Sequence, residues 1–415
     1  MTLSPPLRFA VALWVGVGIA ISVRTVVRPE SHTIFPILAA GVEHWWHDQP
    51  LYDDYPPLDF FRYPPPFAVA LAPFGWLGLR AGGVLWAWLN LAVYAAGLWR
   101  FARRVLPVQW TDARLAVYLS LCLLGGLRGL WNGQSNALLI GMMMIGTAEL
   151  LERRWWRAAF LFAGAILVKP TPLAPILLLC ALWPRSLTPR LAAALILLAA
   201  VPFLTRPPAV VADHYCAWAV HLTESAHERW PGFRDAWTVW QVTRQYALGE
   251  PGVPWLKEPL DSPVYRVVQL LAACAALIWS QRLRRRGMPE RELVGRTLAI
   301  GLAWLMLFGP AVEHATYVFL APVLCWAVLA VGDGTGRRVL IGTAFVLVMV
   351  LSWGSLTRPL LDVLPALLLA LPLGTALFVA WLVGDAIGVG DAAGPISSSF
   401  RVSRRCMGTT VRANH

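Results

Sequence analysis

Ionisable residues are nearly absent from about a dozen apolar stretches of this chain, and they gather in the gaps between those stretches. An unsatisfied backbone amide in lipid costs several kcal/mol, so long apolar stretches are typical of membrane-spanning helices. The 415 residues are 58% hydrophobic and only 14% charged, whereas soluble domains carry about 25% charged residues. The pattern predicts an all-α integral membrane protein with about 12 to 13 transmembrane helices.

The expected spans are apolar runs bounded by polar or basic residues. They are 7–27, 84–102, 114–131, 134–151, 157–169, 171–184, 190–205, 264–281, 295–311, 315–332, 338–354 and 363–384. A further segment, 64–82, is interrupted by prolines and a glycine. We expect it to form a re-entrant or interfacial hairpin, which is tolerated where protein covers it. The first run is predicted to be a retained helix, because no small-residue cleavage site follows it.

The net charge of +12 does not indicate nucleic-acid binding, because most arginines lie in short loops beside apolar runs. Cytoplasmic loops of membrane proteins carry such an excess of basic residues. Both termini are therefore expected in the cytoplasm of a multi-pass protein of the plasma or inner membrane. A membrane domain would cover 1–386, followed by a flexible basic tail at 387–415.

Two long loops, 28–63 and 206–262, then lie on the outer side of the membrane. Seven of the eight histidines fall in outer segments, and this partition is independent of the arginines used to assign the sides. The second loop is too long for a simple connector and is expected to form a lid or an acceptor-binding subdomain.

The first outer loop holds six acidic residues in an otherwise acid-poor chain. Asp53, Asp54 and Asp59 could supply a general base for a hydroxyl acceptor or orient that acceptor, and neighbouring aromatic rings could stack on sugars. The alternative is a solvated loop whose acids only cap short helices. The adjacent Asp53 and Asp54 could also bind a divalent cation through oxygen ligands.

Other polar groups lie at the outer ends of apolar runs. Lys169 precedes a Pro-Thr-Pro turn and is read as a phosphate contact, with a snorkelling side chain as the alternative. Arg62 is expected to share that role. The expected pocket residues are Tyr52, Tyr63, Asn132, Gln134, Asn136, Glu313 and His314. His314 could also share a proton with a loop carboxylate.

Several short motifs occur in an order that resembles glycosyltransferase family 87, the polyprenol-phosphate-dependent mannosyltransferase-like proteins of the GT-C class. They are Leu51-Tyr52-Asp53, Tyr63-Pro64-Pro65, Trp86 to Asn90, Asn132 to Asn136, Ala165 to Pro172, and Glu313-His314 after Pro310. The resemblance covers about residues 1–330.

The resemblance implies a GT-C-type polytopic bundle with its site on the outer face. It implies a polyprenyl-phosphate sugar donor, typically carrying mannose or another hexose, and inverting transfer to a glycolipid or glycan hydroxyl. A carboxylate of the first outer loop would deprotonate the acceptor, and Lys169 would hold the leaving phosphate.

The chain departs from the family where an Asp usually follows the first helix, because it has Glu30-Ser31-His32-Thr33 there. Glu30 or His32 could act as the base, or the role could have moved to Asp53, Asp54 or Asp59. Two alternatives remain, a transporter or flippase of lipid-linked sugars and an inactive scaffold. A transporter should show inverted repeats with broken helices, and no convincing repeat is visible.

Overall fold

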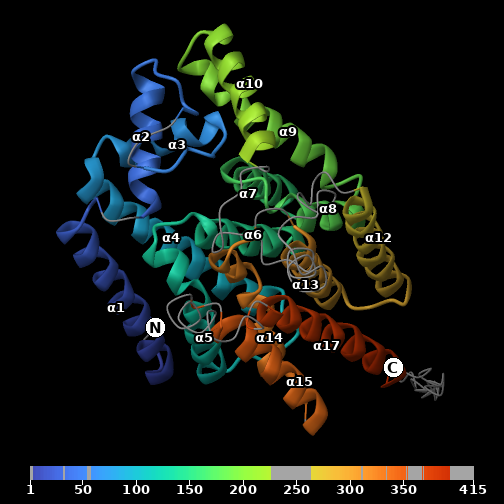
Figure 1. Ribbon diagram of the computed structural model, residues 1–415. Coiled ribbons are helices and arrows are strands. Elements are labelled where there is room, and N and C mark those ends of the chain that lie inside the picture. The colour runs from blue at the N-terminus through green and yellow to red at the C-terminus, as the bar shows by residue number, and fades with distance from the viewer. Residues whose placement is uncertain are drawn as a thin grey trace, which may run out of the picture.

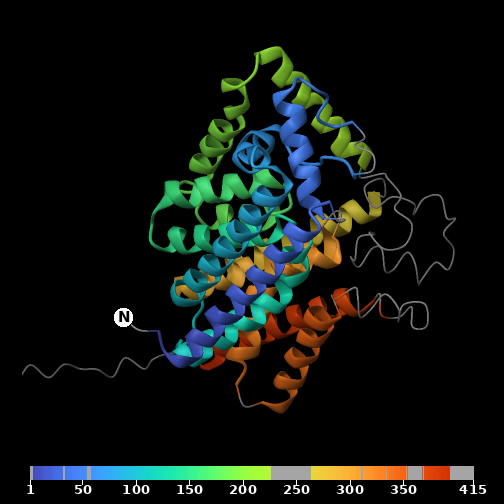
Figure 2. The ribbon, with the colours of Figure 1, turned by 90° about the vertical axis from the view of Figure 1, so that its left-hand side faces the viewer.

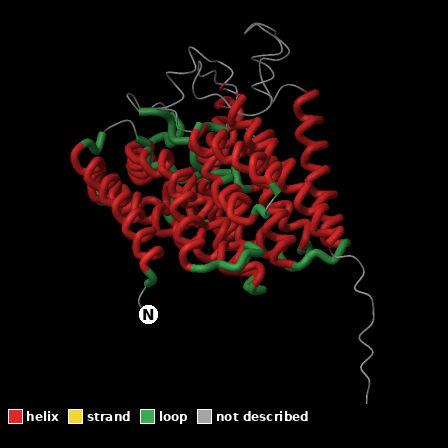
Figure 3. The backbone as a smooth tube through the Cα atoms, turned by 90° about the horizontal axis from the view of Figure 1, so that it is seen from below, coloured by secondary structure: helices red, strands yellow, loops and turns green. Residues whose placement is uncertain are grey.

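The computed structural model describes residues 3–30, 33–53, 58–225, 263–309, 312–332, 334–351, 353, 367 and 369–392. Within these residues the regular structure is entirely helical (Figures 1 and 3). The elements are α1 Pro5–Val27, α2 Ile34–Trp46, α3 Pro65–Gly75, α4 Gly78–Arg104, α5 Asp112–Trp131, α6 Asn136–Leu151, α7 Trp155–Val168, α8 Leu173–Leu182, α9 Thr188–Ala199, η1 Val201–Leu204, α10 Pro208–Ser225, α12 Pro263–Arg285, α13 Glu290–Phe308, η3 His314–Phe319, α14 Ala321–Ala330, α15 Thr335–Phe345, η4 Val346–Val350 and α17 Ala370–Ala392.

Five of the described helices are long and apolar enough to cross a bilayer, namely α1, α4, α5, α12 and the part of α17 up to Ile387. The expectation of an all-α membrane protein is therefore confirmed. Six further apolar helical segments have 10–17 residues, fewer than the roughly 20 that a perpendicular span needs. The total of 12 to 13 spans stays a prediction.

Helix α3 occupies the segment for which a hairpin was expected. Its 11 residues reach about 16 Å at 1.5 Å per residue, roughly half of the hydrocarbon thickness. Gly78 has a φ of +71°, which turns the chain from α3 into α4 at a conformation that glycine adopts without strain. The segment therefore does not cross the bilayer as one straight helix.

Helices α4 and α6 approach each other closely through small residues. A Cβ atom on Gly141 would lie 2.5 Å from the Val93 carbonyl oxygen, and one on Gly97 would lie 2.5 Å from the Gly141 oxygen. Such glycine contacts let helix backbones meet where lipid supplies no hydrophobic drive for association. This pair forms the centre of the bundle, and α6 continues into contact with α7.

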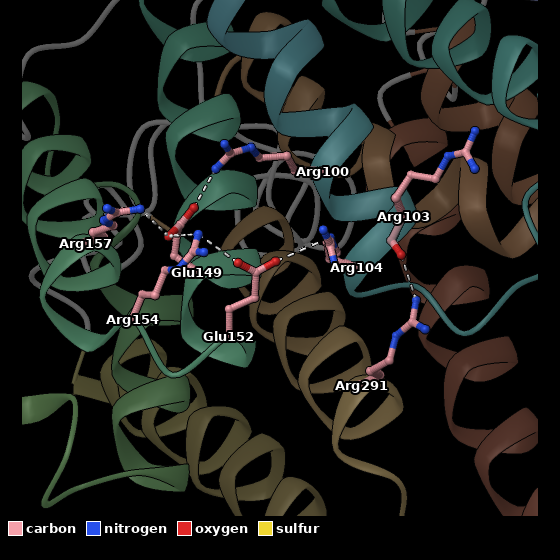
Figure 4. A network of polar contacts seen from close by, with 8 residues as sticks. All are labelled: Arg100, Arg103, Arg104, Glu149, Glu152, Arg154, Arg157 and Arg291. Carbon is pink, nitrogen blue, oxygen red and sulfur yellow. Dashed lines mark hydrogen bonds and ion pairs between the residues drawn. The ribbon is translucent and has the colours of Figure 1, made fainter. Parts of the chain in front are cut away.

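One end of the bundle carries an arginine-rich ion-pair network (Figure 4). Its centre is Glu149, which lies near the end of α6. The Glu149 side chain is only 5% exposed. The ion pairs are Arg100–Glu149 at 2.5 Å, Arg154–Glu149 at 3.3 Å, Arg157–Glu149 at 3.8 Å, Arg104–Glu152 at 3.3 Å and Arg154–Glu152 at 2.9 Å. We call this the Glu149 end. It joins the end of α4, the end of α6 and the start of α7.

The opposite ends of the same helices carry the polar residues expected at the site. Asn136 begins α6, and Lys169 directly follows α7. At 1.5 Å per residue, the 16 residues of α6 and the 14 of α7 separate the two ends by about 20–24 Å. The structure thus separates the loop arginines from the site residues in the way that the sidedness argument requires.

The two expected outer loops contain helices. Helix α2 occupies part of 28–63, and α10 begins the 206–262 loop, of which residues 226–262 lie outside the described structure. Figures 1 and 2 show α2, α3 and α10 together at one end of the molecule. Helix α17 continues beyond the expected domain boundary at 386 to Ala392. The rest of the tail, 393–415, lies outside the described residues.

Candidate functional site

The turn between α5 and α6 is held by helices from distant parts of the chain. The Asn132 carbonyl accepts a hydrogen bond from the Ile34 amide at 2.9 Å, and the Gly133 carbonyl accepts one from Trp86 Nε1 at 2.8 Å. Gly133 has a φ of +67°, which directs its carbonyl toward Trp86 without side-chain strain. Backbone carbonyls fix this turn, and the amide side chains that follow it remain available for other partners.

Those amide side chains connect the start of α6 to the segment before η3. Asn136 Nδ2 donates to Gln134 Oε1 at 3.1 Å and to the Ala315 carbonyl at 3.2 Å. Gln134 Nε2 contacts Glu313 Oε2 at 3.5 Å. Glu313 also caps η3 together with Thr316, whose hydroxyl accepts from the Glu313 amide. Residues about 180 positions apart in the chain therefore form one polar surface.

Lys169 lies in the turn after α7 and faces this surface. Its backbone is extended, and Pro170 follows, so the helix ends at the lysine. Burial lowers the pKa of the Lys169 ammonium, the Glu313 carboxylate raises it, and the Arg62 guanidinium lowers it. Within the described residues Lys169 has no side-chain hydrogen bond or ion pair. The ammonium is thus partly buried near one carboxylate and one guanidinium, and it is bonded to neither.

Arg62 and Tyr63 approach from the end of the first outer loop. The Tyr63 hydroxyl has a pKa raised to about 12, because burial and the Glu313 charge outweigh a hydrogen bond with Ser135 and the charge of Arg62. The backbone at this point is fixed by two aromatic donors: Tyr52 Oη donates to the Tyr63 carbonyl at 3.0 Å, and Trp218 Nε1 donates to the Arg62 carbonyl at 3.4 Å. We call Arg62, Tyr63, Gln134, Lys169 and Glu313 the Lys169 cluster.

The candidate bases differ in how the structure places them. Asp59 accepts a hydrogen bond from the Phe60 amide at 2.9 Å and pairs with Arg62 at 3.4 Å, so it adjoins the Lys169 cluster. Asp53 is exposed beside Tyr52, and Glu30 is exposed after α1. Asp54 and His32 lie outside the described residues.

His314 lies next to Glu313 in sequence but has a different environment. Its side chain is 6% exposed, and burial, reinforced by the Arg128 charge, lowers the pKa of its imidazole to about 3. The ring is therefore neutral at physiological pH. The protonated form would be buried near a guanidinium, which favours the neutral ring, and proton sharing with a loop carboxylate stays a prediction.

Helix α10 contributes residues that the sequence did not single out as site residues. His221 lies 5.8 Å from the Tyr52 ring and 5.5 Å from the Phe60 ring, and His214 lies 5.2 Å from Trp45 (centroid distances). Positions seven apart share one helical face, so this spacing was the available signal. Through these contacts and Trp218, α10 holds the first outer loop in place.

The described residues contain no group of three or more His, Cys, Asp or Glu side chains arranged to hold a metal ion. The Asp53-Asp54 pair is only partly described, so the cation hypothesis stays untested.

No curated protein matches this chain. The crystal structure of ArnT from Cupriavidus metallidurans bound to undecaprenyl phosphate aligns at 15% identity over 91% of this chain and 78% of that chain, with a TM-score of 0.37. The family model of glycosyltransferase family 87 matches residues 60–310, which is more than half of the chain and contains Arg62, Tyr63, Gln134 and Lys169. This match confirms the resemblance drawn from the motifs, and the chain belongs to glycosyltransferase family 87.

Proposed function

We propose that this membrane glycosyltransferase moves a sugar, mannose or another hexose, from a polyprenyl-phosphate donor to a hydroxyl of a glycolipid or glycan. The reaction takes place at the end of the bundle opposite the Glu149 end, which we assign to the outer face of the plasma or inner membrane. Both termini are then cytoplasmic. The observation that carries the proposal is the Lys169 ammonium, which lies near Arg62 and Glu313 yet forms no ion pair within the described residues, so that a phosphate can bind it directly.

In this mechanism the bond between the sugar C1 and the phosphate oxygen breaks while the acceptor oxygen bonds to C1. The departing polyprenyl phosphate keeps the electron pair of the broken bond. Lys169 and Arg62 stabilise the negative charge that develops on the departing phosphate, and stabilisation of this kind is usually the largest single contribution to catalysis. The acceptor proton passes to a carboxylate of the first outer loop.

Asp59 is paired with Arg62, so we assign it to orienting that guanidinium. Asp53 or Asp54 then supplies the base, and a divalent cation bound there would lower the pKa of the acceptor hydroxyl. Gln134 and Glu313 face the donor sugar, and Tyr52, Tyr63, Asn132, Asn136 and His314 support the pocket walls.

The test is sugar transfer from a polyprenyl-phosphate donor by purified protein in nanodiscs. We expect Lys169→Ala to lower kcat/KM by roughly 10²–10³-fold, the usual effect of removing one oxyanion-stabilising group. Lys169→Arg should retain more activity, because the positive charge persists. Arg114→Ala, an exposed residue at the far end of α5, serves as the control. Unchanged kcat/KM in Lys169→Ala would remove the phosphate role, and absence of product from the wild type in a single-turnover assay would favour a transporter.

A further inference from the structure

Three arginines meet at a crevice that the proposed reaction does not use. Arg24 and Arg28 come from the end of α1, and Arg80 comes from the first turn of α4. The enclosed part of the crevice measures only about 20 Å³, so a ligand would lie at its open mouth; Arg24, Arg28, Thr33 and Trp131 are among the lining residues. Arg80 adjoins it, because its Nε donates to the Val26 carbonyl at 3.3 Å.

These guanidinium groups have no carboxylate partner in the described structure. Arg24 donates to the Trp131 carbonyl and lies 4.9 Å from the centroid of that ring, so it is oriented but its charge is not neutralised. Arg28 and Arg80 are exposed, and neither forms an ion pair with any residue that the structure describes. Glu30 follows closely in sequence, yet it too forms no ion pair within that part of the chain. The contrast with the Glu149 end is clear, because arginines there surround carboxylates.

Helix α2 adds further positive potential, since it begins at the same crevice. Thr33 is its N-cap residue, its hydroxyl caps no backbone amide, and the first turn contains no acidic residue. Ile34 donates its amide to the Asn132 carbonyl and Pro36 has no amide hydrogen, so the N-terminus contributes the partial positive charge of the helix dipole rather than a set of free amides. The forked guanidinium groups of the arginines match the several oxygens of a phosphate group.

The surroundings indicate that the phosphate belongs to a lipid. The outward face of α1 below the arginines is apolar and uncovered, with Ile19 54%, Val23 58% and Val27 69% exposed. Leu77 at the start of α4 is also exposed. An acyl chain could lie along this face while its headgroup phosphate lies at the open mouth of the crevice, whereas a free phosphate would gain nothing from the apolar face.

We infer that this crevice binds the phosphate of an anionic membrane lipid. The site is separate from the Lys169 cluster, although the two share the turn after α5: Gly133 lines the crevice, and Gln134 contacts Glu313 on the other side. The lipid therefore supports the turn whose far side forms part of the candidate active site.

Native mass spectrometry of the full-length protein with phosphatidylglycerol, phosphatidylcholine or inorganic phosphate tests this inference without any sugar transfer. The most tightly bound phosphatidylglycerol molecule is the one assigned to this site. We expect the triple variant Arg24→Gln/Arg28→Gln/Arg80→Gln to bind it roughly 100-fold more weakly than the wild type does. Arg28→Gln alone should lose about fivefold, because each basic side chain at a headgroup contributes about that factor. Phosphatidylcholine should bind the wild type and the triple variant equally.

The matched control is Arg8→Gln/Arg114→Gln/Arg285→Gln, which removes three exposed arginines near other helix ends and should leave the tightest lipid bound. The exposed Arg28 keeps the test valid if the triple variant fails to fold. Equal phosphatidylglycerol affinity in wild type and Arg28→Gln would overturn the inference. Displacement of the lipid by low millimolar inorganic phosphate would overturn its assignment to a lipid. Each result is independent of the proposed sugar transfer.

Discussion

Replacing Gly141 by alanine tests the contact on which the bundle centre depends. The new Cβ atom would lie 2.5 Å from the Val93 oxygen, 2.7 Å from the Val93 carbonyl carbon and 2.8 Å from the Tyr94 amide nitrogen. All three atoms are backbone atoms, so no side chain can rotate away. Ordinary contact begins at 3.4 Å, so α4 and α6 must separate locally by about 0.9 Å. Overpacking of this kind costs typically 1–3 kcal/mol.

The control is Gly16→Ala on α1, where a new Cβ atom meets nothing within 4 Å. Both substitutions gain the same helix propensity, so that contribution cancels in the comparison. We expect Gly141→Ala to be about 2 kcal/mol less stable than Gly16→Ala, and to unfold roughly 3 °C lower. The assay is thermal unfolding in identical nanodiscs, read by circular dichroism at one scan rate, since membrane proteins often unfold irreversibly.

The same substitution should lower activity, because α6 begins at Asn136 and helps to form the polar surface beside Lys169. Equal unfolding temperatures for Gly141→Ala and Gly16→Ala would refute the argument, since the two backbones would then not be in contact.

Three further predictions concern the site and its support. Burial lowers the pKa of Lys169 from 10.5, and the protonated form binds phosphate, so kcat/KM should fall as pH rises through that lowered pKa. Because the Glu313 charge raises the pKa of Lys169, a pH–rate profile of Glu313→Gln should show this fall at lower pH. A shift of the fall to higher pH would contradict the arrangement. Glu149→Gln removes the almost buried carboxylate that three arginines share, and it should lower the free energy of unfolding by about 2 kcal/mol, a figure discounted because the arginines are exposed. Asp112→Asn, at a more exposed ion pair, should lower it by under about 1 kcal/mol. Equal unfolding temperatures for the two variants would contradict this. Trp218→Phe removes one hydrogen bond to the first outer loop and should raise the donor KM about threefold while kcat changes less, in line with a loss of about 0.5–1 kcal/mol; a selective fall in kcat would instead place Trp218 at the reacting atoms.

Apolar runs separated by arginine-rich gaps were sufficient to predict an all-α membrane protein, because a long continuous apolar run satisfies its own backbone in lipid as a helix, whereas barrel strands alternate apolar and polar residues. Some helix ends also followed from the sequence, as with Lys169 before Pro170, whereas others did not: α4 begins at Gly78 and not at 84, and α17 begins at Ala370 and not at 363. Motif order identified the family, and the match over residues 60–310 confirmed it.

The helices inside the outer loops were not predicted. Helix α2 packs on α3 and α4, and α10 packs on α3 and η1, so both are stabilised by tertiary contacts rather than by a local sequence pattern. The aromatic contacts of His214 and His221 depend on where α10 docks, and spacing alone does not give that position. The neutral state of His314 likewise follows from its burial near Arg128.

The sequence by itself predicted an all-α membrane protein and which segments are apolar enough to enter lipid, because the cost of moving a side chain into hydrocarbon depends mainly on its residue type. Only the tertiary structure decided which ends meet. It joined Gln134 to Glu313 and placed Arg62 near Lys169. Near the end of α1 it left Arg24, Arg28 and Arg80 without a carboxylate partner among the described residues. Such pairings depend on helix contacts between residues far apart in the chain, and hydropathy carries no information about them.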